Sequence, residues 1–195
     1  MKKYLPIILI CLLFFCFGFS PHMRVIARKN AGGLSYVLKD NNAGGDAGIA
    51  GGYDTTTDRW CLRGTFLTTS AYTVKKIAIG MYRQSSGAQT VTVFICDADG
   101  DTNCVQADST IDVSTLGTSC GEWPEVTITK VLADATTYAI VLSSSAIDAT
   151  DRWAWCDTST GSHSIYSNSI EACANASWDG QEASCEPDFK LWALE

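Results

Sequence analysis

From Arg59 onward, the chain consists of short runs of β-branched and aromatic residues separated by clusters of Gly, Asp, Asn and Ser. In segments 90–95 and 126–129, Thr alternates with Val and Ile, so one face of each segment would be buried and the other would face solvent. We find no stretch of ten or more residues with the 3.6-residue apolar period of a helix. The pattern predicts an all-β domain, and its many short strands are typical of an antiparallel β-sandwich.

The sequence divides into three parts. Residues 59–195 form the predicted β-sandwich domain, and residues 28–58 form a segment with one strand at 34–38 and a Gly-, Ala- and Asn-rich connector at 41–52. That strand is either the first strand of the sandwich or an arm that adds to the sheet edge of a neighbouring molecule. Within the domain, strands are expected over residues 60–68, 72–82, 89–96, 109–113, 125–129, 136–143, 152–156, 164–167 and 188–193.

The first 27 residues have the features of an export signal. A basic start with Lys2 and Lys3 precedes an apolar run over 5–19, which is shorter than the roughly 20 residues of a membrane-spanning helix. We predict a signal peptide over 1–27 that ends at Ala27; an uncleaved N-terminal anchor is the alternative and would be the only contact with a membrane. The protein is therefore expected to be secreted, at the cell surface or free outside the cell.

The charge balance limits the partners. The chain has 14 Lys and Arg against 21 Asp and Glu, a net charge of −7, and loss of residues 1–27 makes the balance more acidic. No basic surplus remains for a phosphate backbone, so nucleic acid is excluded as a partner. His163 is the one histidine beyond the export signal, and we find no Gly-flanked Ser of the hydrolase type, so no enzyme is expected.

Cysteines are numerous enough to act as a covalent framework. Seven of them follow residue 27, and in an oxidising compartment most should pair. Cys96 and Cys104 are the first expected pair, because the seven residues between them suit a hairpin with opposed Cβ atoms; Cys173 with Cys185 is the second. The odd cysteine is either a buried free thiol or half of an intermolecular disulfide.

Several segments carry a resemblance to a known family. The segments that carry it are residues 63–68, 72–82, 90–96, 121–128, 132–142 and 188–192. Through them, the chain from about residue 60 to 195 resembles the choice-of-anchor R type of bacterial surface domain. This resemblance implies a jelly-roll-like β-sandwich displayed outside the cell, stabilised here by disulfides, and it implies no catalytic residues.

An acidic loop follows one of these strands. Asp97, Asp99 and Asp101 stand at positions 1, 3 and 5 of a loop count in which Asp108 is position 12, a spacing at which Ca²⁺ takes oxygen ligands. The alternative is an acidic hairpin turn closed by the Cys96–Cys104 bridge, since Asp and Gly favour such turns. The cofactor is therefore Ca²⁺ or none.

Aromatic residues and one sequon complete the candidate sites. Trp153 and Trp155 stand two residues apart on one strand face, where they either fill the core or offer a platform for a sugar ring, and Trp178 lies in an expected loop. Trp155 and Trp178 are the predicted ligand-binding residues. Asn175 begins an Asn-Ala-Ser sequon, which is a glycosylation site if the export pathway glycosylates.

These features predict a secreted, non-catalytic structural or interaction protein of the cell surface. It would associate with itself, or with other surface proteins, through the N-terminal strand, and so build oligomers or filaments. The alternative is an extracellular carbohydrate-binding module with a glycan ligand, in which Ca²⁺ takes part.

Overall fold

The computed structural model is built almost entirely of strands. It describes residues 34–43, 47–53, 58–59, 61–85, 89–144, 152–158, 165–168, 180–182 and 186–195. The predicted signal peptide, Trp178, Asn175 and the Cys173–Cys185 pair lie outside these residues. Within them, no helix is long and apolar enough to cross a membrane.

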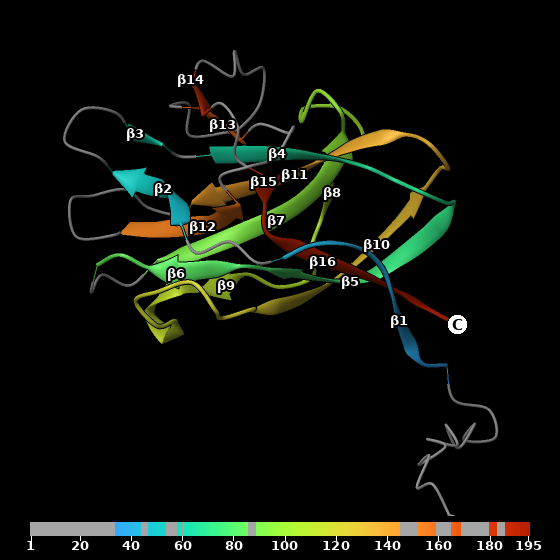
Figure 1. The fold of residues 1–195 in the computed structure, drawn as a ribbon, viewed down its shortest axis with the longest axis horizontal. Coiled ribbons are helices and arrows are strands. Elements are labelled where there is room, and N and C mark those ends of the chain that lie inside the picture. Colours follow the sequence, from blue (N-terminus) through green and yellow to red (C-terminus); the bar gives the residue numbers. More distant parts are fainter. Residues whose placement is uncertain are drawn as a thin grey trace, which may run out of the picture. The chain divides into compact units, whose positions relative to one another are not determined.

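The elements follow one another along the chain as sixteen strands and one short 3₁₀ turn in the described residues (Figure 1). They are β1 (Tyr36–Asn42), β2 (Ala47–Tyr53), β3 (Asp58–Arg59), β4 (Cys61–Leu67), β5 (Tyr72–Ile79), β6 (Met81–Arg83), β7 (Thr90–Asp97), β8 (Val105–Gln106), β9 (Ile111–Asp112), η1 (Val113–Thr115), β10 (Glu125–Leu132), β11 (Thr137–Ser144), β12 (Arg152–Thr158), β13 (Ile165–Asn168), β14 (Gly180–Glu182), β15 (Glu186–Pro187) and β16 (Phe189–Leu194). Each strand expected in the domain overlaps one of them.

The strands form three sheets in which all paired strands are antiparallel. Sheet I has the order β1-β16-β5-β10, and sheet II has the order β14-β13-β4-β11-β7-β8 with β9 also on β7. Sheet III has the order β15-β12-β2-β3 with β6 also on β12. The chain passes from sheet I to sheet III at the β5–β6 step and from sheet III to sheet I at the β15–β16 step.

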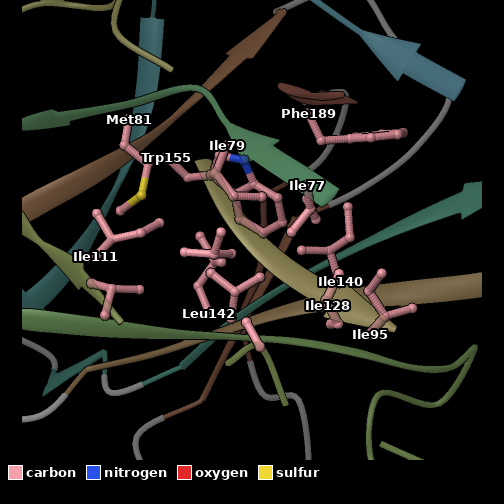
Figure 2. Packing of buried hydrophobic residues seen from close by; sticks show 14 of the residues in the cluster. Ile77, Ile79, Met81, Ile95, Ile111, Ile128, Ile140, Leu142, Trp155 and Phe189 are labelled. Carbon is pink, nitrogen blue, oxygen red and sulfur yellow. The ribbon is translucent and has the colours of Figure 1, made fainter. Parts of the chain in front are cut away.

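One hydrophobic core connects the three sheets. Sheet I contributes Ile77 and Ile128, sheet II contributes Ile140, and sheet III contributes Trp153 and Trp155 to the same buried cluster. Figure 2 shows side chains from different sheets packed between the strands. Strand β10 alternates strictly between exposed and buried positions, as its Thr/Val/Ile pattern predicted. The prediction of an all-β, antiparallel fold is confirmed; jelly-roll connectivity stays a prediction.

The N-terminal segment differs in part from its prediction. Strand β1 pairs with β16 of its own chain, so it is an outer strand of sheet I. Residues 47–53, which fall mostly in the expected connector, instead form β2, which pairs with β12. Glycine disfavours a strand through entropy and a missing side chain, but the ladder hydrogen bonds come from the backbone. A partner strand can therefore order a Gly-rich segment, and local composition cannot reveal that partner.

Sheets I and III meet at a triangle of backbone hydrogen bonds among Gly80, Cys156 and Asp188. The Gly80 N–H donates to the Asp188 carbonyl at 3.0 Å, the Asp188 N–H donates to the Cys156 carbonyl at 2.9 Å, and the Cys156 N–H donates to the Gly80 carbonyl at 2.7 Å. The indole Nε1–H of Trp155 also donates to the Asp188 carbonyl, at 3.0 Å. We call this group the junction triangle.

Glycine at position 80 lets these three strands approach. A Cβ atom built on Gly80 would lie 2.8 Å from the Cβ atom of Asp188, closer than real carbon atoms pack. At Gly117, by contrast, the nearest atom to an added Cβ is Oε1 of the Glu122 side chain, which can move away. The two glycines therefore form a matched pair for a test of the junction triangle.

We expect Gly80→Ala to lower the free energy of unfolding by about 1–3 kcal/mol, the usual cost of overpacking a rigid site. Gly117→Ala should change it by less than about 1 kcal/mol, as most surface substitutions do. Urea denaturation followed by tryptophan fluorescence measures both. Equal effects of the two substitutions would mean that the close approach at Gly80 is not a constraint on the fold.

Disulfides connect the hairpin loop and the junction triangle to their surroundings. Cys96 is bonded to Cys104, the pair expected from the sequence, and Cys120 is bonded to Cys156, a pair that spacing did not suggest. Cys61 is also disulfide-bonded. Bonded cysteines on three separate parts of the chain indicate an oxidising environment.

The two bridges should differ in their effect on stability. Residues 96 and 104 are 8 apart and residues 120 and 156 are 36 apart, so loop entropy assigns about 2.5 kcal/mol to the first and about 4 kcal/mol to the second. We expect the double variant Cys120→Ser/Cys156→Ser to unfold at a lower urea concentration than Cys96→Ser/Cys104→Ser. A lower urea midpoint for Cys96→Ser/Cys104→Ser than for Cys120→Ser/Cys156→Ser would contradict the placement of the Cys120–Cys156 bridge at the junction triangle.

Candidate functional site

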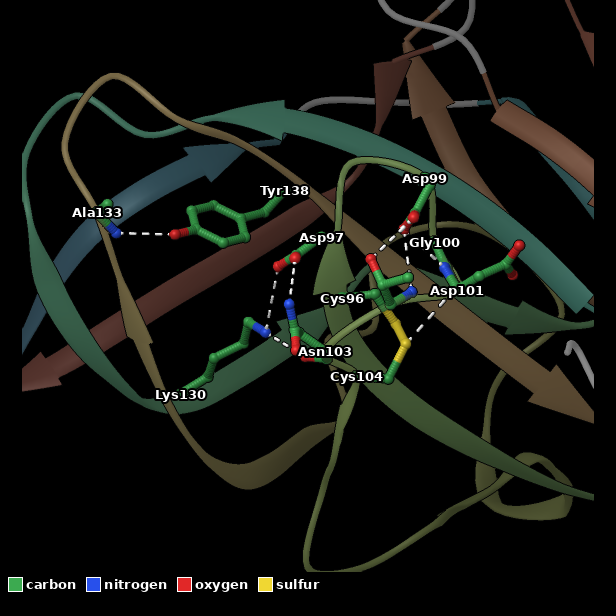
Figure 3. A network of polar contacts seen from close by, with 11 residues as sticks. Cys96, Asp97, Asp99, Gly100, Asp101, Asn103, Cys104, Lys130, Ala133 and Tyr138 are labelled. Atoms are coloured by element: carbon green, nitrogen blue, oxygen red, sulfur yellow. Dashed lines mark hydrogen bonds and ion pairs between the residues drawn. A yellow bond between two sulfur atoms is a disulfide. The ribbon is translucent and has the colours of Figure 1, made fainter. Parts of the chain in front are cut away.

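The predicted calcium loop is folded around its own hydrogen bonds. Oδ1 of Asp99 accepts the backbone N–H groups of Asp101 and Thr102, each at 3.0 Å, and its Oδ2 accepts the Thr102 hydroxyl at 2.8 Å. Oδ2 of Asp97 accepts the Asn103 amide at 2.6 Å. Figure 3 shows that Asp97, Asp99 and Asp101 point in different directions around the loop. These bonds engage both carboxylate oxygens of Asp99 and one of Asp97.

The remaining groups of the loop also disfavour a cation. Oδ2 of Asp108 accepts a hydrogen bond from the hydroxyl of Thr127 at 2.8 Å, so this carboxylate is bonded to strand β10 and not to the acidic loop. The ammonium of Lys130 lies 3.8 Å from Oδ1 of Asp97 and donates to the Asn103 carbonyl. Burial lowers the pKa of Lys130 and the charge of Asp97 opposes that shift.

The hydrogen bonds of Asp97, Asp99 and Asp108 favour the acidic turn over a calcium site, and calcium binding by Asp97, Asp99, Asp101 and Asp108 stays a prediction. No group of three or more His, Cys, Asp or Glu side chains in the described residues could hold a metal ion. The spacing of acidic residues was compatible with two structures, and the Asx-type turn closed by the Cys96–Cys104 bridge is the one that forms.

We expect the pKa of Asp99 to lie below its ordinary value of 3.8. The hydrogen bonds from the backbone of Asp101, then those from Thr102, favour the charged carboxylate, and nearby Arg63 adds a smaller effect. Because the folded pKa is lowered, the stabilisation is present at neutral pH and is lost as the pH falls through that pKa. A carboxyl ¹³C NMR titration with and without Ca²⁺ measures it. A pKa at or above 3.8, or a Ca²⁺-dependent shift, would contradict this account of the loop.

The tryptophan prediction fails at Trp155. Both Trp153 and Trp155 are completely buried, and each indole N–H has a partner inside the protein: Ser144 Oγ at 2.7 Å for Trp153 and the Asp188 carbonyl for Trp155. No face of either ring is open to a sugar. The two residues do share one side of β12, but that side faces the core because large apolar rings fill the space between sheets.

Three exposed apolar residues lie at the start of β1, and Val131 of β10 is a further one in sheet I. Leu34, Tyr36 and Leu38 are 71%, 48% and 46% exposed, and they alternate along the strand and therefore share one face. Trp192 of β16 is the register partner of Leu38, and Lys76 of β5 is the register partner of Trp192. We call these five residues the β1 face.

Lysine 76 joins the aromatic rings of the β1 face. Its ammonium lies 4.4 Å from the ring centroid of Trp192 and 4.9 Å from that of Tyr36. It also forms an ion pair with Glu125 of β10 at 2.9 Å. The two rings are thus held in fixed positions beside each other, which reduces the entropy that a partner would have to remove from them.

The backbone of β1 presents a free edge beside this face. Ser35 and Glu195 exchange both of their backbone hydrogen bonds, at 2.9 and 3.0 Å. In an antiparallel pair such residues alternate with residues whose N–H and C=O groups point away from the partner strand. Leu34, Tyr36 and Leu38 therefore direct their backbone groups away from β16, and no described strand pairs with that edge.

The other edge of sheet I, on β10, is contacted at Thr127. The backbone N–H of Asp108 donates to the Thr127 carbonyl of β10 at 2.9 Å, and the Asp108 carboxylate accepts the Thr127 hydroxyl. Within β1, a register shift between Leu38 and Asp40 disturbs the ladder, so regular geometry is confined to residues 34–38. That short stretch is the regular part of the β1 edge, and no described strand pairs with its outer side.

Comparisons with known proteins add no relative: no family model and no curated protein matches the chain. The resemblance to the choice-of-anchor R type of domain stays a prediction. Sequence reasoning located the N-terminal strand but did not find the β1 face. The apolar alternation of Leu34, Tyr36 and Leu38 was a possible signal, although only the register with β16 tells which side faces outward.

Proposed function

We propose that this protein is an exported, non-catalytic interaction module that associates with a second copy of itself through the edge of β1. The observation that carries the proposal is the coincidence, on residues 34–38, of outward backbone groups and exposed apolar side chains. Natural sheet edges usually carry charges, prolines or covering segments that prevent such pairing. Residues 34–38 contain no charged residue and no proline, and no described strand pairs with their outer edge, whereas Thr127 at the opposite edge of the sheet is hydrogen-bonded to Asp108.

The proposed pairing has a definite register. With Tyr36 of each copy at a two-fold axis, Leu34 of one copy faces Leu38 of the other in an antiparallel pair. All three residues then use their outward N–H and C=O groups, and their apolar side chains meet across the new strand pair. The register stays clear of the irregularity at Asp40. A two-fold contact of this kind closes on itself, so the assembly is a dimer with a continuous sheet.

Export and surface location are part of the same proposal. The apolar N-terminal run and the bonded cysteines support transport to an oxidising compartment. Outside the cell, a disulfide-stabilised sandwich with a self-complementary edge would serve as a building or adhesive unit at a surface.

We expect Leu38→Lys to weaken dimer formation at least tenfold, which corresponds to about 1.4 kcal/mol. The two-fold axis places a lysine of each copy in the contact, where burial of an unpaired charge is unfavourable. The matched control is Val131→Lys, which changes an apolar residue that is 74% exposed on β10, at the opposite edge of the same sheet. Sedimentation-velocity analysis of purified protein without residues 1–27 measures both.

Two outcomes would refute the proposal: a wild-type protein that stays monomeric at high micromolar concentration, or equal weakening by both substitutions. The measurements are made with and without alkylation of free thiols, so that a disulfide-linked dimer is recognised as a separate species. Circular dichroism of each variant verifies that the fold is intact.

A further inference from the structure

A cavity of about 270 Å³ lies at the far end of β1 from the dimer contact. The last residues of β1, the strand β4 and the β15–β16 step line it; among these residues are Asp40, Asn41, Asn42, Phe66, Pro187 and Phe189. Its size lies just below the range of about 300–1,000 Å³ that is usual for small-molecule sites. It therefore suits a single ring-sized ligand.

Part of the cavity wall is apolar and firmly packed. Phe66 and Phe189 are buried, and their ring centroids are 5.2 Å apart. Pro187 lies close to Gly64 of β4: a Cβ atom on Gly64 would lie 2.4 Å from the Cγ atom of Pro187, so only glycine allows this contact. The wall is a fixed apolar surface of which only the edges are open, since Phe66 and Phe189 are 4% and 5% exposed, and the C–H groups of a ligand can pack against these edges.

Two hydrogen-bond acceptors stand beside this wall in fixed orientations. The Tyr72 hydroxyl donates to Oδ2 of Asp40 at 2.5 Å, and the Asn42 amide donates to the Pro187 carbonyl at 3.1 Å. Burial, followed by the contact with Asp40, raises the pKa of Tyr72, so its hydroxyl remains a donor. Oδ1 of Asp40 and the side-chain carbonyl of Asn42 accept no hydrogen bond from any described residue. Both oxygens can accept from a ligand without rearrangement.

The charge of the lining excludes anions. Asp40 and Glu186 line the cavity, and no Lys, Arg or His is among the described lining residues. A ligand must therefore donate hydrogen bonds, carry no negative charge and present an apolar face to Phe66 and Phe189. A small ammonium ion would leave the apolar wall uncovered, whereas a sugar ring meets all three requirements because its hydroxyls donate and its C–H face is apolar.

We infer that this cavity is a binding site for one neutral monosaccharide unit, with Asp40 and Asn42 as hydroxyl acceptors and the phenylalanine wall as the packing surface. The inference goes beyond the proposed dimer and does not depend on it. It also differs from the sequence-based carbohydrate hypothesis, since neither Trp155 nor Trp178 takes part.

Saturation-transfer-difference NMR tests the site with glucose, galactose, mannose and N-acetylglucosamine as probes. Irradiation of the aromatic protons should transfer magnetisation to the ring protons of at least one sugar, with millimolar affinity. Asp40→Ala should weaken that binding at least fivefold, whereas the matched substitution Asp134→Ala, at an exposed turn outside the cavity, should leave it unchanged. The Leu38→Lys variant should bind the sugar like the wild type, which separates this site from the dimer contact.

Thr69→Trp provides a second test that leaves Tyr72 and the core untouched. Thr69 is an exposed lining residue in the bend after β4, so a large ring at this position should block the mouth of the cavity and abolish the transfer signal in a folded protein. Binding that survives both Asp40→Ala and Thr69→Trp would overturn the assignment. So would the absence of transfer to all four sugars, or a preference for choline that disappears at high salt, which would identify an organic-cation site instead.

Discussion

The connection between sheets I and III depends on the three backbone hydrogen bonds that join Gly80, Cys156 and Asp188. Gly80 and Asp188 lie where the chain passes between sheets I and III, and Cys156 lies within β12 of sheet III. A side chain at position 80 would separate the strands, and the Asp188 carbonyl also receives the indole N–H of Trp155. The junction triangle thereby fixes the indole ring of Trp155. The Cys120–Cys156 bridge adds a covalent connection at the same place.

The position of β16 follows from this arrangement, and the position of β1 follows from β16. Because Asp188 is held in the triangle, β16 begins at a defined point beside β5, and its outer edge is available for β1. The register between β1 and β16 then directs Leu34, Tyr36 and Leu38 outward. The same register brings Asp40 to the Tyr72 hydroxyl and Asn42 to the Pro187 carbonyl. The proposed dimer edge and the proposed sugar site are thus consequences of one strand pairing.

The acidic loop and the buried tryptophans illustrate how little a residue type says without its partners. Asp99 has the spacing of a calcium ligand, but the N–H groups of its own loop occupy its oxygens. Trp155 has the ring of a sugar platform, but its indole belongs to the core. Asp99 finds its hydrogen-bond partners within its own loop and Trp155 finds one 33 residues away in the chain, and nothing in the linear sequence excludes either outcome.

The alternation of Thr with Val and Ile along β7 and β10, together with the turn residues between strands, was sufficient to predict strands, their buried faces and the Cys96–Cys104 hairpin. These properties depend on neighbours within a few residues, and a two-residue period reports them directly. Strand β2, the Cys120–Cys156 bridge, the outward side of β1 and the cavity beside Asp40 were decided only by the tertiary structure. Each requires pairing between segments far apart in the chain. The backbone groups that form these hydrogen bonds are the same in nearly every residue, so the pairing produces no periodic pattern of residue types in either segment.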